Sequence, residues 1–475
     1  MVGNKAPENI FVNDIHSQLN RTPVRQLMRP TSIEELKEAV RGAQANHLNI
    51  SISSGRHAMG GQPFGKDTCL IDMRGLNDVV AFDFQRGLID IEAGIEWPDV
   101  IDYLIQVQQG RQKAWGIIQK QTGADRLSLG GSLSANVHGR GLTRKPIIDD
   151  VESFVLMDVK GDLKKCSRSE NPELFRAAIG GYGVFGIIVR VELRLAPRIK
   201  LRRMVKVIDI EGLMRAFEAH IKEGFVFGDF QYATDESSDD FLRKGVFSCY
   251  QPVSDDTPIA KEQKELSMED WVRLYTQGHH DKTGAFNAYS EYYRTTSGQI
   301  YWSDSHQLSL YPEGYHQGVD QLLGTEPGSE MITEVNVPRV QLTTFMNQVR
   351  EDFRSHDVDV FYGTIRLIEK DAESLLPWAK ESYVCIIFNL HTAHTPQALN
   401  KTAVDFRRLI DRALALGGTY YLTYHRWATR RQVTAAYPRF PEFLELKLKY
   451  DPDELIQSDW YRHYRDIFRD KREAA

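Results

Sequence analysis

Residues 128–141 read SLGGSLSANVHGRG, a stretch with four glycines and mainly small side chains up to His138. Glycine is unfavourable inside a helix or strand, so this composition is costly in either element. A flat ring system could instead lie against the backbone, while the hydroxyls of Ser128 and Ser132 donate hydrogen bonds to phosphate oxygens. A purely structural helix-turn is the alternative interpretation.

A second glycine-rich segment, SGRHAMGG, occupies residues 54–61 and follows a strand predicted over 48–52. Backbone N–H groups in such a loop can form an anion-binding nest for a pyrophosphate. Glycine allows positive φ angles and a close approach of the ligand. An ordinary loop is the alternative. The candidate binding residues here are Ser54, Gly55, Arg56, His57, Ala58, Met59, Gly60 and Gln62.

The third segment, GGYGVFGII, covers residues 180–188, and its glycines at 181, 183 and 186 satisfy GxGxxG. That pattern indicates a nicotinamide dinucleotide site only where it follows a strand and opens a helix. Here a helix is predicted over 172–179 and a strand over 185–195, so the order is reversed. The match is therefore a false positive for NAD.

The surrounding pattern predicts an α+β fold rather than a regular doubly wound sheet. Ser32 and Glu35 have capping-box spacing, which predicts a helix through about Ala45. Strands are predicted at 69–73 and 88–92, a helix over 98–107 and a hairpin over 154–167. Beyond Arg198 the chain becomes rich in Tyr, Phe and Trp. We therefore expect three parts: 22–198 with the glycine-rich segments, 199–425 with substrate contacts, and a helical segment, 426–475.

Bulk properties exclude several classes of protein. The net charge of −6 argues against a nucleic-acid partner, because phosphate contacts need clustered Lys and Arg. No apolar stretch approaches the roughly 20 residues that span a bilayer, and residues 1–20 lack the apolar core of a signal peptide. The four cysteines are far apart, with no CxxC pair, and indicate thiols in a reducing compartment. We expect a soluble cytoplasmic enzyme.

In their order and spacing, the three glycine-rich segments resemble the FAD-binding domain of the vanillyl-alcohol oxidase (PCMH-type) family, over roughly residues 25–200. The resemblance implies a PCMH-type domain of two α+β subdomains, followed by a substrate or cap domain built on an antiparallel sheet. It implies FAD as the cofactor, with the first segment at the pyrophosphate and the second beside the isoalloxazine. The further FAD-binding residues it implies are Ser128, Leu129, Gly130, Gly131, Ser132, Ala135, Asn136, His138, Gly139, Gly186 and Ile188.

Within the family, Arg56-His57 is most similar to the GxRHS element of alditol and aldonolactone oxidases, whose His is often joined to the flavin. By this resemblance His57 carries a covalent bond to FAD, although Ala58 stands where the relatives usually have Ser. A His57 that only packs near the flavin is the alternative. Residues 123–127 contain no cysteine, so no second covalent link is expected.

Catalytic candidates follow from the same relatives. The segment 362–366, YGTIR, is similar to their substrate-domain strand with Glu-x-Arg; Arg366 matches the Arg, but Thr364 replaces the Glu. The segment 421–427, YLTYHRW, corresponds to a place where those oxidases and decaprenylphosphoryl-ribose oxidase have a Lys. Here Tyr424 would donate a hydrogen bond, or His425 would act as general base, since its ordinary pKa lies near neutral. Surface or core roles remain alternatives for all three residues.

The expected activity is FAD-dependent oxidation of a hydroxyl group on a small sugar-like, polyol or lactone substrate, by hydride transfer to flavin N5. Electrons would then pass to oxygen or another acceptor. A non-covalent dehydrogenase acting on a lipid-linked or glycosylated substrate, and a flavin-binding protein without turnover, are the alternatives. His279-His280 and His391-x-x-His394 lack a carboxylate or Cys at metal-ligand spacing, so we predict structural or surface roles and no metal.

Overall fold

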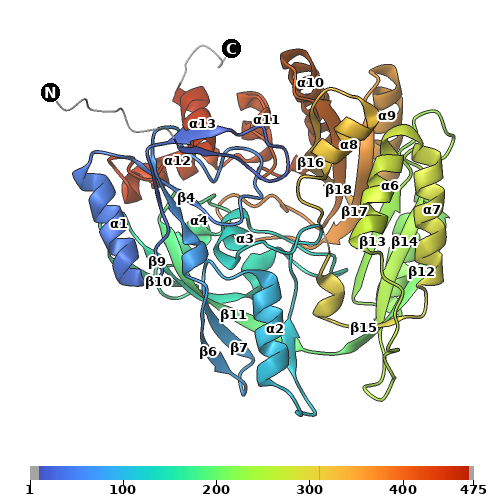
Figure 1. Ribbon diagram of the computed structural model, residues 1–475, viewed down its shortest axis with the longest axis horizontal. Coiled ribbons are helices and arrows are strands. Elements are labelled where there is room, and N and C mark those ends of the chain that lie inside the picture. Colours follow the sequence, from blue (N-terminus) through green and yellow to red (C-terminus); the bar gives the residue numbers. More distant parts are fainter. Residues whose placement is uncertain (1–9, 310, 470–475) are drawn as a thin grey trace.

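The computed structural model describes residues 10–309 and 311–469 and places them in two lobes that lie side by side (Figure 1). The first lobe is built mainly from residues 10–197, and the second lobe from residues 200–420. Two of the predictions concern residues 1–20 and 426–475. Within these ranges, residues 1–9 and 470–475 lie outside the described residues. Helices and antiparallel sheets occur together in the chain, so the prediction of an α+β fold is confirmed.

The first lobe contains a short hairpin and two larger sheets. Its strands are β1 (Ile10–Val12), β2 (Thr22–Val24), β3 (Gln26–Met28), β4 (Ile50–Ser53), β5 (Cys69–Asp72), β6 (Val79–Asp83), β7 (Leu88–Glu92), β8 (Trp115–Ile117), β9 (Val151–Met157), β10 (Leu163–Ser167) and β11 (Ile187–Pro197). Its helices are α1 (Ile33–Ala45), α2 (Trp97–Val107), α3 (Leu129–Ala135) and α4 (Pro172–Ala178). A parallel sheet has the order β3-β5-β4, and an antiparallel sheet has the order β10-β9-β11-β7-β6, with β8 paired to β11.

Local signals in the sequence account for several of these elements. Ser32 is the N-cap of α1, and its hydroxyl accepts a hydrogen bond from the Glu35 backbone N–H at 3.1 Å. The Glu35 carboxylate accepts from the Thr31 backbone N–H instead of from Ser32, so the capping box is displaced by one residue. The third glycine-rich segment does follow a helix, α4, and open a strand, β11, which confirms that it is no Rossmann fingerprint.

One eight-stranded antiparallel sheet dominates the second lobe. Its strands are β12 (Lys200–Asp209), β13 (Phe227–Tyr232), β14 (Lys244–Pro252), β15 (Ile300–Trp302), β16 (Gly328–Pro338), β17 (Val360–Ile368), β18 (Tyr383–Ala393) and β19 (Thr419–Tyr420). The strand order is β15-β12-β14-β13-β17-β18-β16-β19. The expected antiparallel sheet of the cap domain is therefore present.

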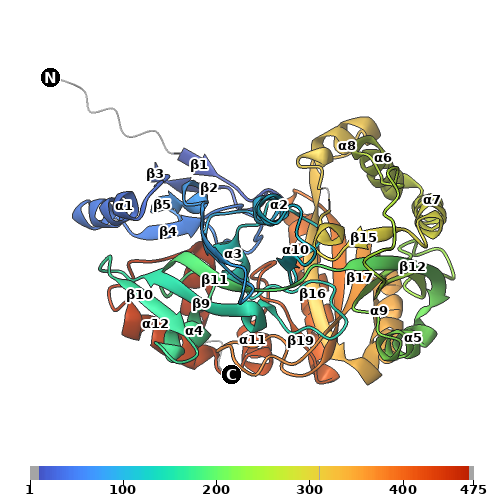
Figure 2. The same ribbon diagram turned by 90° about the horizontal axis from the view of Figure 1, so that it is seen from below.

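Two groups of helices cover the two faces of this sheet. They are α5 (Ile210–Lys222), α6 (Met268–His280), α7 (Lys282–Thr295), α8 (Tyr315–Leu323), α9 (Leu342–Ser355) and α10 (Pro396–Ala415). Figure 2 shows α6, α7 and α8 on one side of the sheet and α5 and α9 on the other. Buried residues of α5, α9 and α10 belong to the main hydrophobic core. In contrast, α6 and α7 each bury one residue, Gly278 and Ser290.

The last three helices return to the first lobe. They are α11 (Arg430–Ala436), α12 (Phe440–Tyr450) and α13 (Asp459–Arg469). Ile50 of β4 donates its N–H to the Leu455 carbonyl at 2.7 Å and accepts from the Gln457 N–H at 2.8 Å. Trp460 packs on Tyr182, with ring centroids 4.7 Å apart. The last described residues of the chain thus contact β4 and Tyr182 of the first lobe.

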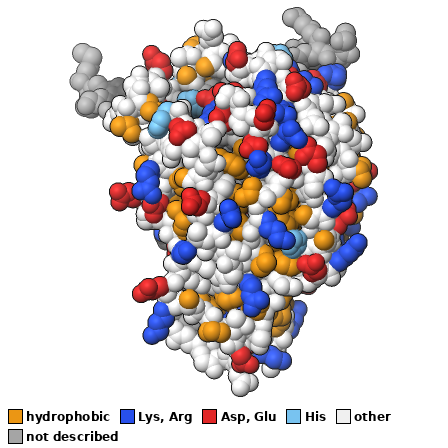
Figure 3. Space-filling model, turned by 90° about the vertical axis from the view of Figure 1, so that its right-hand side faces the viewer, with side chains coloured by type: hydrophobic (Ala, Val, Ile, Leu, Met, Phe, Trp, Pro, Cys, Tyr) orange, Lys and Arg blue, Asp and Glu red, His pale blue; other side chains and the backbone are white. Residues whose placement is uncertain are grey.

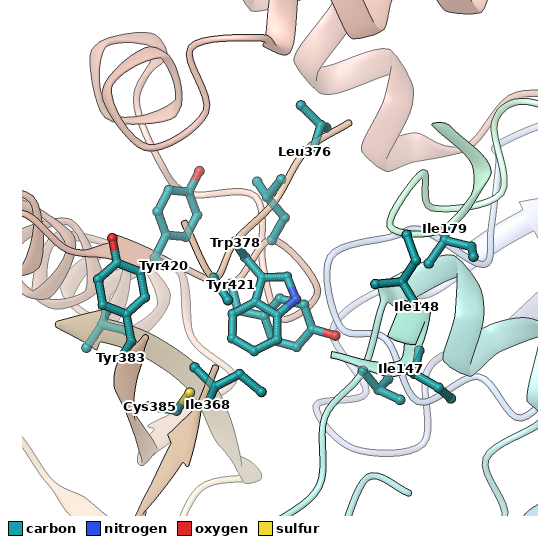
Figure 4. Packing of buried hydrophobic residues seen from close by; sticks show 14 of the residues in the cluster. Ile147, Ile148, Ile179, Ile368, Leu376, Trp378, Tyr383, Cys385, Tyr420 and Tyr421 are labelled. Carbon is teal, nitrogen blue, oxygen red and sulfur yellow. The ribbon is translucent and has the colours of Figure 1, made fainter. Parts of the chain in front are cut away.

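A continuous hydrophobic core joins the two lobes. Trp378, from the segment between β17 and β18, donates its indole N–H to the Asn136 carbonyl at 3.0 Å. Figure 4 shows Trp378 and Tyr421 between Ile147, Ile148 and Ile179 of the first lobe and Ile368 and Cys385 of the second. Burial of large apolar side chains across this junction holds the lobes in one arrangement.

The surface mixes both signs of charge on the face seen in Figure 3, where Lys and Arg alternate with Asp and Glu around hydrophobic side chains. The four cysteines, Cys69, Cys166, Cys249 and Cys385, are all buried and unpaired, and all lie in the described chain. Within residues 10–309 and 311–469, none of the helices has the length and apolar character needed to cross a membrane.

Candidate functional site

A cavity of about 390 Å³ lies between the two lobes. This volume is typical of small-molecule sites. The glycine-rich segments of the first lobe form one wall, and residues on the α6–α8 side of the eight-stranded sheet form the other. The structure thus brings together residues that lie far apart in the sequence, such as His57 and Arg366.

The loop after β4 forms the first part of the cavity wall. Ser54, Gly55, Arg56, His57, Ala58 and Gln62 all line the cavity. Arg56 has φ +57°, a left-handed conformation that bends the chain sharply after the strand. The Ser54 hydroxyl and the Arg56 Nε are buried, and neither has a hydrogen-bond partner in the described part of the chain. Both are donors, so the loop offers two unused donors to an anion.

The second segment forms the short helix α3, with Ser128 as its N-cap. The cavity is lined here by Ser128, Gly130, Gly131, Ser132 and Ala135. Both predicted phosphate-binding hydroxyls also accept hydrogen bonds within the protein, Ser128 from the Gly131 N–H and Ser132 from the Trp97 indole. A Cβ on Gly130 would lie 3.0 Å from the Ala93 Cβ, so only glycine lets α3 pack this closely.

The third segment lines the same wall through Tyr182, Gly183, Gly186 and Ile188. Gly186 has φ +150°, which L side chains rarely adopt, and a Cβ there would lie 2.4 Å from the Leu156 side chain. Each of the three segments thus contributes at least one glycine to the wall of the same cavity.

Several predicted cofactor residues lie behind this surface rather than on it. They are Met59, Gly60, Leu129, Asn136, His138 and Gly139, which do not line the cavity. Asn136 is fully buried; its amide donates to Asp371 and accepts from the Ile148 N–H, so it holds the backbone that carries α3. His138 is also fully buried, with Nε2 2.9 Å from Glu334 Oε1. Some residues of a glycine-rich motif form the surface that faces the ligand, and others hold that surface in place. The sequence alone does not show which residues do which.

His57 faces the cavity with both ring nitrogens in contact with protein. Its Nε2 lies 2.9 Å from the Arg126 carbonyl, which can only accept a hydrogen bond, so Nε2 carries the proton. Its Nδ1 lies 3.0 Å from His16 Nε2. Burial, and then the neighbouring His16, lower the pKa of His57 to about 3. The imidazole is therefore neutral, with its lone pair on Nδ1.

The opposite wall is the face of the sheet that carries Arg366. Tyr362, Thr364 and Arg366 alternate along β17 and point to the same side, and all three line the cavity. Arg366 is 7% exposed, and its Nε and Nη1 have no hydrogen-bond partner among the described residues. A buried guanidinium with unused donors is suited to binding a negatively charged or polar group.

Asp229 of β13 is a site residue that the sequence reasoning missed. Gln231 pairs with Thr364, so the antiparallel register places Asp229 beside Arg366. Arg140, just after the second glycine-rich segment, lies 3.4 Å from Asp229 Oδ2. The other oxygen, Oδ1, has no hydrogen-bond partner within the described chain, and Asp229 lines the cavity. No local motif surrounds Asp229, so only the strand pairing reveals it.

The two C-terminal candidates have different environments. Tyr424 lines the cavity, and its hydroxyl donates to Glu334 Oε2 at 3.4 Å. Burial, followed by Glu334, raises the pKa of Tyr424 well above its usual value, so it is a hydrogen-bond donor. His425 does not line the cavity; it stacks on Phe406 with ring centroids 4.3 Å apart. Burial lowers the pKa of His425 to about 3, so the geometry favours Tyr424 over His425 as the residue that contacts substrate.

Aromatic side chains form the outer part of the cavity, and the sequence indicated them only as a change in composition. They are Trp271, Tyr275, Tyr289, Tyr293, Tyr311, Tyr315, Phe361 and Tyr362. Most of them come from α6, α7 and the segment leading into α8.

Comparison with known proteins agrees with this geometry. Residues 24–167 match the family model of the FAD binding domain. This part of the chain is a PCMH-type FAD-binding domain. An uncharacterized oxidoreductase, ORF5 in the fasciation locus of Rhodococcoides fascians, is 32% identical over 185 residues, which are 39% of this chain and 39% of the relative.

Two further relatives have assigned activities. L-gulonolactone oxidase of Bos taurus is 24% identical over 200 residues (42% of this chain, 43% of the relative). Cytokinin dehydrogenase 1 of Arabidopsis thaliana is 25% identical over 212 residues (42% and 36%). The chain spans less than half the length of each of these three relatives.

The residues of the FAD-binding domain fit the cofactor on structural grounds. The unused donors of Ser54 and Arg56 suit a pyrophosphate. Gly130, Gly131 and Gly186 line the cavity without side chains, so this part of the wall suits a flat ring system in close contact with backbone. FAD requires both of these features in one continuous cavity.

Proposed function

We propose that the protein is an FAD-dependent oxidoreductase that oxidises a hydroxyl group of a small molecule. The observation that carries this proposal is the single cavity, which joins the FAD-binding surface to Asp229, Arg366 and Tyr424. The similarity to L-gulonolactone oxidase supports a sugar-like or lactone substrate. Bound FAD supplies the hydride acceptor, and the remaining tasks belong to side chains of this chain.

Asp229 is the residue best placed to accept the hydroxyl proton. Its Oδ1 is free of protein partners in the described chain, whereas its Oδ2 lies 3.4 Å from Arg140. Arg366 lies beside it and supplies positive charge where negative charge develops. Tyr424 donates a hydrogen bond and stays protonated, because its pKa is raised by burial.

Position 364 bears on the substrate class. Thr364 stands where the resembling oxidases have a polyol-binding carboxylate, and its hydroxyl has no hydrogen-bond partner among residues 10–309 and 311–469. Neighbouring strands supply Gln231 and Asn389, whose amides can bind hydroxyls. The aromatic outer cavity favours a substrate with a ring that can stack, such as a lactone, a glycoside or an aromatic alcohol.

A second candidate is oxidation of a cytokinin-like substrate. The aromatic residues of α6 and α7 favour it, and so does the match to cytokinin dehydrogenase 1. A dehydrogenase that acts on a lipid-linked or glycosylated substrate and a flavin-binding protein without turnover remain the alternatives that experiment has to distinguish. A cytoplasmic location, and oxygen or another compound as electron acceptor, stay predictions from the sequence.

Anaerobic mixing of the FAD-loaded protein with candidate substrates tests the proposal. We expect loss of flavin absorbance with at least one lactone, glycoside or aromatic alcohol. Asp229→Asn should slow that reduction about 10²–10⁴-fold, the usual contribution of a general base, with FAD content unchanged. Asp240→Asn, which removes a carboxylate paired with Lys244 outside the cavity, is the matched control. Flavin that stays oxidised with every compound, including a cytokinin, would support the protein without turnover.

A covalent bond between FAD and His57 stays a part of this proposal. The neutral imidazole has its lone pair on Nδ1, so a bond from Nδ1 would replace the contact with His16. Acid precipitation and intact mass test it: yellow protein with the added mass of FAD, lost in His57→Ala, is the expected result. Release of all flavin into the supernatant shows that His57 only contacts the cofactor.

A further inference from the structure

One carboxylate in the second lobe gathers three imidazoles from different elements. Glu330 of β16 is 6% exposed. Its Oε1 lies 3.4 Å from His279 Nε2 of α6 and 3.2 Å from His391 Nδ1 of β18. Its Oε2 lies 2.8 Å from His316 Nδ1 of α8. No carboxylate stands at metal-ligand spacing from His279 or His391 in the sequence, but the strand pairing of Glu330 with His391 supplies one.

The spacing of these atoms matches a metal coordination shell. In a tetrahedral site with metal–nitrogen bonds of 2.0–2.1 Å, neighbouring ligand atoms lie about 3.3–3.4 Å apart. The contacts of 3.2 and 3.4 Å at Oε1 have this length. All three ligand atoms lie within 4.8 Å of one another. We propose that His279, Glu330 and His391 bind a divalent transition-metal ion of the zinc class.

The second oxygen of Glu330 is held by separate residues. The Tyr315 hydroxyl and His316 both bind Oε2, which leaves Oε1 directed at the two imidazoles. Metal-binding carboxylates are commonly oriented in this way by hydrogen bonds to the oxygen that does not bind the ion. The arrangement therefore supplies ligands and the groups that position them.

His279 distinguishes this cluster from a simple network of ion pairs. The His279 side chain is 8% exposed. Its Nε2 has no hydrogen-bond partner within residues 10–309 and 311–469, because the 3.4 Å contact with Glu330 is poorly aligned for a hydrogen bond. Its ring stacks on Phe361, with centroids 4.6 Å apart, which fixes its orientation.

The site lies at the edge of the substrate cavity. Glu330, Tyr315, His316 and Phe361 line the cavity, and so do Trp271 and Tyr275 of the helix that carries His279. Because α6 buries one residue, Gly278, apolar packing holds this helix weakly. An ion shared by α6, β16 and β18 would fasten the aromatic side of the cavity to the sheet.

Metal binding by the FAD-loaded protein tests the proposal. After treatment with a chelator and desalting, the protein is titrated with Zn²⁺ and with Co²⁺, and bound metal is measured by elemental analysis. We expect one ion per chain. His279→Phe, which keeps the ring stack, and Glu330→Gln, which keeps the shape, should each weaken binding at least 100-fold. His280→Ala is the matched control, since this neighbouring His is exposed and its Nδ1 hydrogen-bonds the Thr276 carbonyl at 2.9 Å.

Two results would overturn the proposal: binding below one equivalent in the wild type, or binding unchanged in both variants. The described chain holds one other group of this kind, His138, Glu334 and Cys385. A thiolate-to-Co²⁺ absorption band would place the ion there and reject the His279 site. Far-UV circular dichroism confirms that each variant is folded. Proteolysis within 253–299 should also slow several-fold in wild type on adding Zn²⁺, but not in His279→Phe.

Discussion

The two walls of the cavity are built in different ways. The FAD-binding wall uses three short continuous segments, in which glycines bring the backbone against the ligand. The substrate wall uses single side chains from β13, β16, β17 and β18, which become neighbours only when the sheet forms. A cofactor shared by many enzymes is recognised by backbone shape, whereas the substrate is recognised by separate side chains that can change one at a time.

The largest expected effect comes from adding a side chain to the FAD-binding wall. Gly186→Val would place a Cβ 2.4 Å from Leu156 in a conformation that L residues rarely adopt. Overpacking and backbone strain together cost roughly 2–5 kcal/mol. We expect loss of FAD binding, measured as the ratio of flavin to protein absorbance, and a lower melting temperature.

Gly212→Ala is the matched control for this change, because a Cβ on Gly212 of α5 meets nothing within 4 Å. Its FAD content should equal that of the wild type. Normal FAD content in Gly186→Val would contradict the view that backbone shape forms this wall.

A change on the substrate wall should affect the reaction and leave FAD in place. Arg366→Met removes a buried guanidinium that faces the cavity. Loss of one electrostatic contact to the reacting group costs about 10²–10³-fold in rate. Anaerobic stopped-flow measurement of flavin reduction gives this value, with FAD content as the internal reference. Arg350→Met on α9 is the control, and equal rates in both variants would remove Arg366 from the site.

The smallest expected effect is on stability and comes from His425. This residue was predicted as a general base for the substrate, but it is buried in the structure. The pKa of His425 is near 6.5 in the unfolded chain and about 3 in the folded chain. Between these values the unfolded chain binds the proton, so the free energy of unfolding rises with pH and its full value is present above pH 6.5. At pH 5 the loss from this one residue is roughly 2 kcal/mol.

His425→Asn should therefore lose about 2 kcal/mol less stability than the wild type between pH 7.5 and pH 5. Urea unfolding at the two pH values measures the difference. His16 and His57 also have lowered pKa values, so only the difference between the two proteins is informative. If the wild type and His425→Asn lose equal stability between the two pH values, and the variant reduces flavin much more slowly, His425 acts in the active site.

The first lobe was predicted well from the sequence because its signals are local. The Ser32 cap, the strand Leu88–Glu92 and the reversed order of the third glycine segment all depend on residues close together in the chain. Within the motif the signals are less specific, because Asn136 is buried and donates to Asp371 instead of lining the cavity. A motif gives the residues of a site without saying which of them face the ligand.

The substrate wall could be predicted only in part. Arg366 was found through its resemblance to a strand in known oxidases, but Asp229 has no motif and depends on strand register. Tyr424 and His425 are adjacent, yet Tyr424 faces the cavity and His425 stacks on Phe406. Which of two neighbours faces a cavity depends on packing far away in the sequence, which no local pattern encodes.

The pairing of β4 with the segment near Ile456 has a consequence for how the protein is made. Ile50 is bridged by Leu455 and Gln457, and β4 leads directly into the loop that carries Ser54 and His57. A chain still on the ribosome that ends before residue 455 lacks this neighbouring strand and the Trp460 packing on Tyr182. The loop that carries Ser54 and His57 therefore gains its full set of supporting contacts only when the C-terminal segment is in place.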